Sequence, residues 1–283
     1  MSVLGPKQSR LGELPRRRRN VMSTINHEHR HVFIEHTLAI TCLCPTYRRP
    51  ARLVANAIAC FERQTYPAAC RRLIVLDDGG GLVPQCGPGW QIVSVVDRYP
   101  TLPAKYNALV ALAAGADALA VWEDDDIYLP WHLEAHAAAL ARAPWSHPKT
   151  VWSLYGGKLH QEPAGGRFHA ALAFRRDALL DKAIGGWIET PRGDFDQQLL
   201  AALSRRFGTP GDPCDGFAPS YVFRWGSTGS YHGQAFIGGD GIKGDWYGRI
   251  PERASLIQGS SCIAPQLDEE TIHIFDEAVK LEP

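Results

Sequence analysis

The sequence predicts an α/β fold, with a mostly parallel sheet and helices on both of its faces. Two observations lead to this class. From residue 36 to residue 143, short apolar segments alternate with longer segments of helical periodicity, and repeated strand–helix units build parallel sheets that helices cover. After residue 143 the pattern is less regular, which predicts a smaller mixed region beside this sheet.

Each element has its own signal. Continuous apolar runs predict buried strands, and a proline at residue 50 and a glycine at residue 115 mark the beginning and the end of helices. In chain order we expect a strand at 36–44, a helix at 50–64, strands at 71–78 and 91–96, a helix at 102–116, a strand at 117–126, a helix at 129–143, strands at 151–157 and 168–176, and a helix from Asp194 to about Arg206.

Length and composition fit one globular domain with tails. The chain has 283 residues, of which 45% are hydrophobic and 21% charged, as is ordinary for globular proteins. Low apolar content and clustered charge predict a disordered, basic and histidine-containing tail over residues 1–35. We expect the domain over residues 36–265, with halves at 36–130 and 131–265, and a C-terminal tail or helix over residues 266–283.

The charge balance argues against a nucleic-acid-binding protein. The chain has 30 Lys and Arg residues against 30 Asp and Glu residues, whereas proteins that bind nucleic acid usually carry a basic excess. Four arginines, Arg16 to Arg19, form a local basic run. We expect this run to be a solvated tail; the alternative is a patch that contacts a membrane surface or nucleic acid.

The cysteine pattern predicts a reducing compartment. Seven cysteines are an odd number, and no Cys-x-x-Cys pair occurs, which favours buried thiols over a disulfide framework. No apolar stretch approaches the roughly 20 residues that span a bilayer, and the first residues lack the apolar core of a signal peptide. We therefore expect a cytoplasmic protein, which begins at Met1 or at Met22.

Four consecutive acids, Glu123 to Asp126, follow an apolar strand and are called the acid run below. Like charges this close repel unless they are solvated or share a cation, and clustered carboxylate oxygens suit Mg²⁺ or Mn²⁺. The carboxyl ends of neighbouring parallel strands meet at one edge of a sheet, where ligands bind. The acid run is therefore expected beside the end of the first strand; the alternative is a solvated turn before a helix.

The second strand ends in Asp77 and Asp78, and three glycines follow. Glycines let the chain turn sharply beside a ligand, and an aspartate can accept hydrogen bonds from a base or a ribose; a simple turn is the alternative. Lys105 lies in the first turn of a predicted helix, where a cation opposes the helix dipole. An anionic partner would explain this position, and snorkelling to water is the alternative.

These segments together resemble a known family. TCLCPTYRRP, LIVLDDGGG and AKYNALVALAAGADALAVWEDDDIYLP are similar to the nucleotide-binding half of family 2 glycosyltransferases with the GT-A fold. FHAALAFRRDALLDKAIGGW and GDFDQQLLAAL resemble that family's acceptor half. The resemblance covers residues 37 to 206 and implies a Rossmann-type GT-A domain, with a nucleotide-binding half at 36–130 and an acceptor half at 131–265.

The resemblance also implies an activity. Family 2 enzymes transfer a sugar from a nucleotide-sugar donor, by default a UDP-sugar, to a hydroxyl of a saccharide or another acceptor. Transfer uses Mg²⁺ or Mn²⁺ and inverts the anomeric carbon. An aspartate acts as the general base for the acceptor hydroxyl.

On the donor side, the family pattern assigns a role to each matching residue. Asp125 is the expected metal ligand, and His232 resembles a late histidine that helps to hold the metal or the diphosphate; a structural histidine is the alternative. Two departures occur: Glu123 replaces the usual first aspartate of the acid signature, and Gly193 replaces the usual acid before the base. The remaining donor-site residues are Pro45, Thr46 and Tyr47 in the nucleotide pocket, Asp77 at the base, Lys105 beside the nucleotide, and Glu123 and Asp124 at the metal or the ribose.

On the acceptor side, Asp194 matches the general base and Asp196 is the fallback; helix capping is the alternative for both. Sugar faces stack on aromatic rings, so Gly186, Trp187 and Trp225 could form the acceptor floor, with core packing as the alternative for the tryptophans.

Three other functions were weighed. A sugar nucleotidylyltransferase would need a glycine-rich basic loop after the first strand, and PTYRRPARL has no glycine. A non-catalytic nucleotide- or carbohydrate-binding module would have no reason to keep Asp77, Asp125 and Asp194 together. His132 and His136 have the spacing of a zinc-protease helix, but that pattern requires Glu directly after the first histidine, and Leu133 stands there.

Overall fold

A seven-stranded sheet forms the centre of the computed structural model, which describes residues 37–155, 158–191 and 193–224. The strand order is β3-β4-β2-β1-β5-β10-β7. The four central strands β4, β2, β1 and β5 are parallel, while β3 and β10 run antiparallel to their neighbours. The bounds are β1 Ile40–Thr46, β2 Arg71–Asp77, β3 Gln85–Gly87, β4 Trp90–Ser94, β5 Ala118–Val121, β7 Trp145–Ser146 and β10 Ala173–Arg175.

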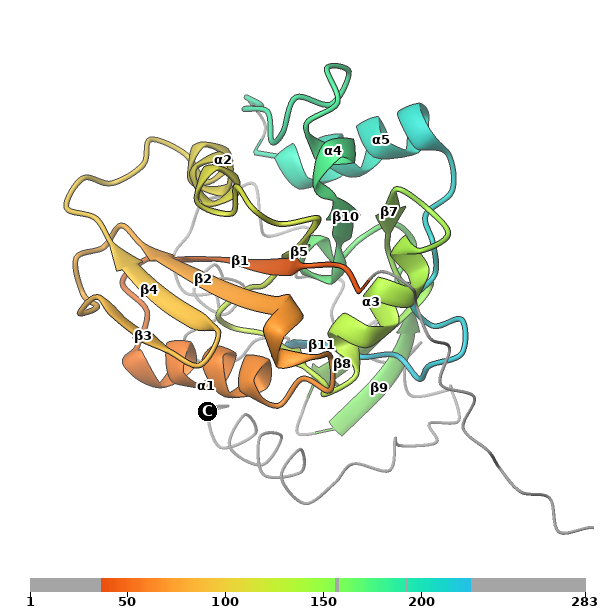
Figure 1. The fold of residues 1–283 in the computed structure, drawn as a ribbon. Helices are drawn as coiled ribbons and strands as arrows, with labels where there is room; N and C mark the ends of the chain where they lie inside the picture. The colour runs from red at the N-terminus through yellow and green to blue at the C-terminus, as the bar shows by residue number, and fades with distance from the viewer. Residues whose placement is uncertain (1–36, 156–157, 192, 225–283) are drawn as a thin grey trace, which may run out of the picture. The chain divides into compact units, whose positions relative to one another are not determined.

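Helices cover both faces of this sheet, as the sequence predicts. Figure 1 shows α1 (Ala51–Glu62) and α2 (Leu102–Leu112) on opposite sides of the central strands. β5 is buried along its whole length, which explains why its sequence is continuously apolar. Thr101 caps α2 by accepting a hydrogen bond of 3.2 Å from the backbone N–H of Ala104. The remaining helices are α3 His132–Leu140, α4 Arg176–Leu179 and α5 Phe195–Phe207, with 3₁₀ turns at Ala68–Cys70 and His169–Ala171.

A smaller mixed sheet makes up the second region. Its order is β6-β11-β8-β9, where β11 pairs parallel with β8 and antiparallel with β6. Its strands are β6 Ile127–Tyr128, β8 Thr150–Tyr155, β9 Lys158–Pro163 and β11 Tyr221–Arg224. The predicted fold class, an α/β domain with a mostly parallel sheet and a smaller mixed region, is therefore confirmed.

Some predicted boundaries were wrong. The expected strand at 168–176 is interrupted because Phe168 takes a left-handed backbone conformation, with φ of 63°, and a 3₁₀ turn follows it before β10. The expected strand at 117–126 ends at Val121, so the acid run lies in a turn between β5 and β6 instead of inside a strand. The first strand begins at Ile40, later than expected.

The strand ends meet where the sequence predicts. Thr46, the last residue of β1, pairs with Asp77 of β2, and Asp77 pairs with Ser94 of β4. On the other side of β1, Leu43 pairs with Val121, two residues before the acid run. Three predicted site segments thus lie at one edge of the sheet. Within the described part of the chain, no helix is both long and apolar enough to cross a membrane.

Two histidines of α3 lie in the core. His132 and His136 are each 1% exposed, and their ring centroids are 4.5 Å apart. The Nδ1 atom of His136 is 2.9 Å from Oγ of Ser146. Burial lowers the pKa of His136 to about 3 and holds the pKa of His132 well below its usual value. Both rings are therefore neutral in the folded protein at neutral pH.

We expect acid to destabilise the fold through these histidines. Between their unfolded pKa near 6.5 and their lower folded pKa, the unfolded chain binds more protons, so the free energy of unfolding falls as pH falls. The loss is about 1.4 kcal/mol per pH unit for each histidine. His136→Asn can keep the bond to Ser146 and should remove one histidine's share. Chemical denaturation tests this, and unfolding free energies that change in parallel for wild type and variant on acidification would contradict it.

Candidate active site

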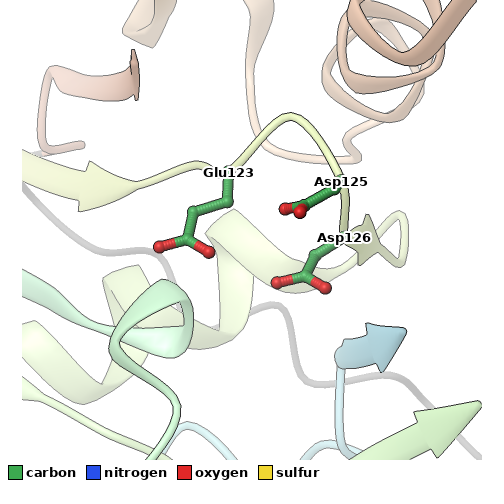
Figure 2. A group of neighbouring side chains, drawn as sticks. All are labelled: Glu123, Asp125 and Asp126. Atoms are coloured by element: carbon green, nitrogen blue, oxygen red, sulfur yellow. The ribbon is translucent and has the colours of Figure 1, made fainter. Parts of the chain in front are cut away.

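The acid run places three of its carboxylates in one cluster. One carboxylate oxygen from each of Glu123, Asp125 and Asp126 lies within 4.8 Å of the other two, and Figure 2 shows the three side chains extending from one turn on the same side. Asp125 and Asp126 are buried, whereas Glu123 keeps 30% of its side chain exposed. Hard oxygen donors grouped in this way fit Mg²⁺ or Mn²⁺.

Strand β11 fixes the far end of the acid run. The hydroxyl of Tyr221 donates to Oδ2 of Asp126 at 2.5 Å, and the backbone N–H of Arg224 donates to Oδ1 at 3.2 Å. The guanidinium of Arg224 also donates to the backbone carbonyl of Asp125, at 3.0 Å. The second sheet therefore holds the turn in place and leaves the carboxylate of Asp125 directed at the cluster.

Arg49 forms ion pairs with two acids of the run. Its Nε lies 3.2 Å from Oδ1 of Asp124, and one terminal nitrogen lies 3.1 Å from Oδ2 of Asp125. The Arg49 side chain is 15% exposed, and residue 49 lies three positions after the end of β1. One guanidinium thus bridges two neighbouring acids.

Crowding shifts the acids toward protonation. Burial and the charge of Asp125 raise the pKa of Asp124 to about 6, although Arg49 opposes the shift. Burial and the charges of Asp125 and Asp124 also raise the pKa of Glu123. A divalent cation would offset this repulsion, because it favours the ionised carboxylates. The side chains present therefore fit a bound Mg²⁺ or Mn²⁺.

The side chains of Trp187, His169 and Tyr106 together orient Glu123. The indole N–H of Trp187 donates to Nε2 of His169 at 2.8 Å, so a neutral His169 carries its proton on Nδ1. That atom lies 3.5 Å from Oε1 of Glu123. The ring of Trp187 is stacked on Tyr106, with centroids 4.6 Å apart, and the hydroxyl of Tyr106 lies 3.4 Å from the same Glu123 oxygen. Burial lowers the pKa of His169 to about 4, so the imidazole of His169 is neutral at neutral pH.

Trp187 is a core residue in the structure. It is 2% exposed, and Asn107 holds its backbone with two hydrogen bonds, of 2.8 and 3.0 Å. Gly186 has φ of 84°, and a side chain there would lie 2.6 Å from the Asn107 amide oxygen. Of the two alternatives for Trp187, core packing describes its position, and its ring presents no open face for a sugar.

Lys105 and Asp78 form a buried ion pair beside the ends of β1 and β2. The Lys105 ammonium lies 2.5 Å from Oδ1 of Asp78 and also donates to the backbone carbonyl of Thr46. Oδ2 of Asp78 accepts a hydrogen bond from the backbone N–H of Tyr99, at 3.0 Å. Lys105 is 3% exposed, so it ties the ends of β1 and β2 to α2.

Asp77 holds the loop that follows β2. Its carboxylate accepts backbone hydrogen bonds from Gly79 at 2.8 Å, Gly81 at 3.0 Å and Leu82 at 2.9 Å. Asp77 is 1% exposed. Whatever it contacts in a ligand, it also shapes the glycine loop beside the strand ends.

The segment after β1 has an unusual backbone. Arg48 has φ of 51°, a conformation that is costly for a residue with a side chain and is common at functional sites. A Cβ atom at residue 79 would lie 2.7 Å from the backbone nitrogen of Arg48, so a side chain there would clash with this segment. The guanidinium of Arg98 lies over the ring of Tyr47, 4.1 Å from its centroid. Two basic side chains therefore flank Tyr47, since Arg48 also lies over this ring.

Two aspartates lie at the start of helix α5. Asp194 is the residue before the helix, yet its side chain makes no capping bond; one carboxylate oxygen accepts from Nε2 of Gln198 at 3.2 Å. Asp196 lies in the first turn, and its charge raises the pKa of Glu123 and opposes the fall in the pKa of His169. The start of α5 therefore lies in electrostatic reach of the acid run.

The structure brings together most of the expected donor-site residues and adds others. Trp225 and His232 lie outside the described residues. Residues that the sequence interpretation missed are Arg49, His169, Tyr221 and Arg224. Of these, only Arg49 had a signal, because it adjoins a motif that was recognised.

Comparisons with known proteins give a fold. No protein-family model matches the chain, and no curated protein matches it by sequence. Among solved structures, S. aureus TarS 1–349 in complex with UDP matches with a TM-score of 0.54 and 13% identity, over 66% of this chain and 60% of that one. The same protein in complex with UDP-GlcNAc matches with a TM-score of 0.54 and 14% identity, over 86% and 70%.

S. aureus TarS matches with a TM-score of 0.51 and 14% identity, over 86% of this chain and 42% of that one. This chain therefore spans only part of the length of such proteins. At this identity the likeness shows the fold, which is GT-A-like.

Proposed function

We propose that this protein is a glycosyltransferase that moves a sugar from a nucleoside-diphosphate sugar to an acceptor hydroxyl, with Mg²⁺ or Mn²⁺. The observation that carries the proposal is the meeting of Thr46, Asp77 and the acid run at one edge of a GT-A-like sheet. Ligands bind at this edge in open α/β sheets. TarS was crystallised with UDP and with UDP-GlcNAc, and this favours a UDP-sugar as the donor.

The nucleotide would bind between the segment after β1 and the loop that Asp77 holds. Pro45, Thr46 and Tyr47 would line one wall, and the glycine loop after β2 would form the other. Asp77 would reach the base through Oδ1, which accepts a hydrogen bond from the backbone N–H of Gly79 in the structure. The ammonium of Lys105 would contribute positive charge from within the core, because Asp78 and Thr46 hold it there.

The acid run would hold the cation through Asp125, with Glu123 and Asp126 as neighbours in the cluster. When bound, the cation supplies positive charge to the departing diphosphate. Asp124 would lie at the edge of this group; in the structure it pairs with Arg49. Glu123 is oriented by His169 and Tyr106 instead, which gives the longer side chain at this position a fixed direction.

The reaction itself would need one base. Asp194 would accept the proton of the acceptor hydroxyl while the hydroxyl oxygen bonds to the anomeric carbon and the bond to the diphosphate breaks. A single displacement inverts the anomeric configuration. The position of Asp194 directly before α5, where its side chain makes no capping bond, supports this role over helix capping.

Ligand binding and product release together test this function. We expect UDP with Mn²⁺ to raise the melting temperature by several degrees, since a ligand at 100 times its Kd stabilises the folded state by about 2.7 kcal/mol. A UDP-sugar should then release UDP in the presence of an acceptor. Release of pyrophosphate from a sugar phosphate and UTP would identify a nucleotidylyltransferase instead. Stabilisation without either product would identify a binding module.

A further inference from the structure

We propose that Arg49 is an internal counter-ion of the acid run, which a divalent cation displaces and which then binds the donor diphosphate. This inference rests on the proposed function and adds a residue that the family pattern does not assign. It starts from the position of one guanidinium, 3.2 Å from Asp124 and 3.1 Å from Asp125.

The two partners of Arg49 explain why it must move. Asp125 is a member of the carboxylate cluster and the expected metal ligand. A cation bound there would lie beside the guanidinium, and two positive charges within about 4 Å repel strongly in a partly buried site. Asp124 and Asp125 are 4% and 8% exposed in their side chains, so little water screens this repulsion. Arg49 and a divalent cation therefore compete for Asp125.

The surroundings of Arg49 offer its guanidinium a second binding partner, the donor diphosphate. Its side chain is 15% exposed, unlike the buried Lys105. It follows the segment Pro45–Tyr47, on the side of the sheet where the nucleotide would lie. A guanidinium presents paired N–H donors that match phosphate oxygens as well as carboxylates. Arg49 can thus exchange a pair of carboxylates for a diphosphate, which would make cation binding and donor binding mutually reinforcing.

Calorimetric titration of the full chain with MnCl₂ alone, and then with UDP at saturating Mn²⁺, tests this inference. Arg49→Gln should bind Mn²⁺ about tenfold more tightly than wild type, because the competing charge is gone. The same variant should bind UDP with Mn²⁺ about tenfold more weakly, because the charge-assisted hydrogen bonds to phosphate are lost. Arg49→Lys keeps the charge without the paired donors, so its Mn²⁺ affinity should stay close to that of wild type.

Arg205→Gln is the matched control, since it removes the same charge from an exposed position on α5. If Arg49→Gln binds Mn²⁺ no more tightly than this control, the counter-ion role is overturned. Tighter Mn²⁺ binding with unchanged UDP affinity would overturn the transfer to the diphosphate. Should Arg49→Gln fold poorly, the double variant Arg49→Gln, Asp124→Asn removes both members of one pair and is titrated in its place against Asp124→Asn. If wild type itself binds no UDP with Mn²⁺, the proposed function fails instead.

Discussion

Asp194→Asn is expected to lower turnover by a factor of roughly 10²–10⁴, the usual contribution of a positioned general base. The amide cannot accept the acceptor's proton, while its size is nearly unchanged. Donor affinity should change little, because the base acts on the acceptor and the nucleotide is held at the other strand ends. Steady-state kinetics with calorimetric UDP binding separates the two quantities. Helix capping is not at stake, since the Asp194 side chain makes no capping bond in the structure.

Asp196→Asn is the matched control, two residues further along α5. Its charge acts on Glu123 and His169, so its removal should alter their electrostatic surroundings and reduce turnover much less. An inactive Asp196→Asn beside an active Asp194→Asn would move the base to Asp196. Full activity in both variants would remove the aspartate mechanism altogether.

Asp125→Asn is expected to abolish cation-dependent UDP binding and to leave the fold nearly unchanged. The variant removes one of three clustered carboxylates, and a neutral amide is a much poorer ligand for a hard divalent cation. The charge of Asp125 raises the pKa of both Glu123 and Asp126. Its removal relieves that repulsion, so stability without metal should be equal to that of wild type or about 1 kcal/mol higher.

Calorimetry of UDP with Mn²⁺ and thermal melts measure these two effects separately. Asp215→Asn is the control, because Asp215 is an exposed acid that lies 3.6 Å from Arg142 at the surface. Wild-type affinity for Mn²⁺ and UDP in Asp125→Asn would refute the assignment of Asp125 as a ligand.

The parallel sheet could be predicted because each of its central strands has a local sequence signal. β1 and β5 are almost entirely buried and β2 is buried from Leu73 onward, so each contains an apolar run, and the helices between them carry turn and cap signals. The meeting of Thr46, Asp77 and the acid run at one edge then follows from strand direction alone.

The second sheet could not be predicted in the same way. Within this sheet, β6 has two residues and β11 has four, so both are too short for a periodic pattern and exist through pairing with distant strands. For the same reason the partners of the acid run, Tyr221 and Arg224, carry no signal in the sequence. The indole–imidazole contact that orients Glu123 likewise depends on packing between residues that are far apart in the chain.

The clamp of β11 on the acid run has a consequence for how the protein is made. Tyr221 lies 95 positions after its partner Asp126, and Arg224 lies 99 positions after Asp125. Contacts at such separation form late, because a long loop must close before they stabilise anything. On the ribosome the parallel strands emerge and can pair well before β11 does. We therefore expect the turn that carries the acid run to be among the last parts of the fold to form, and a nascent chain stopped before residue 221 to hold the central strands without this clamp.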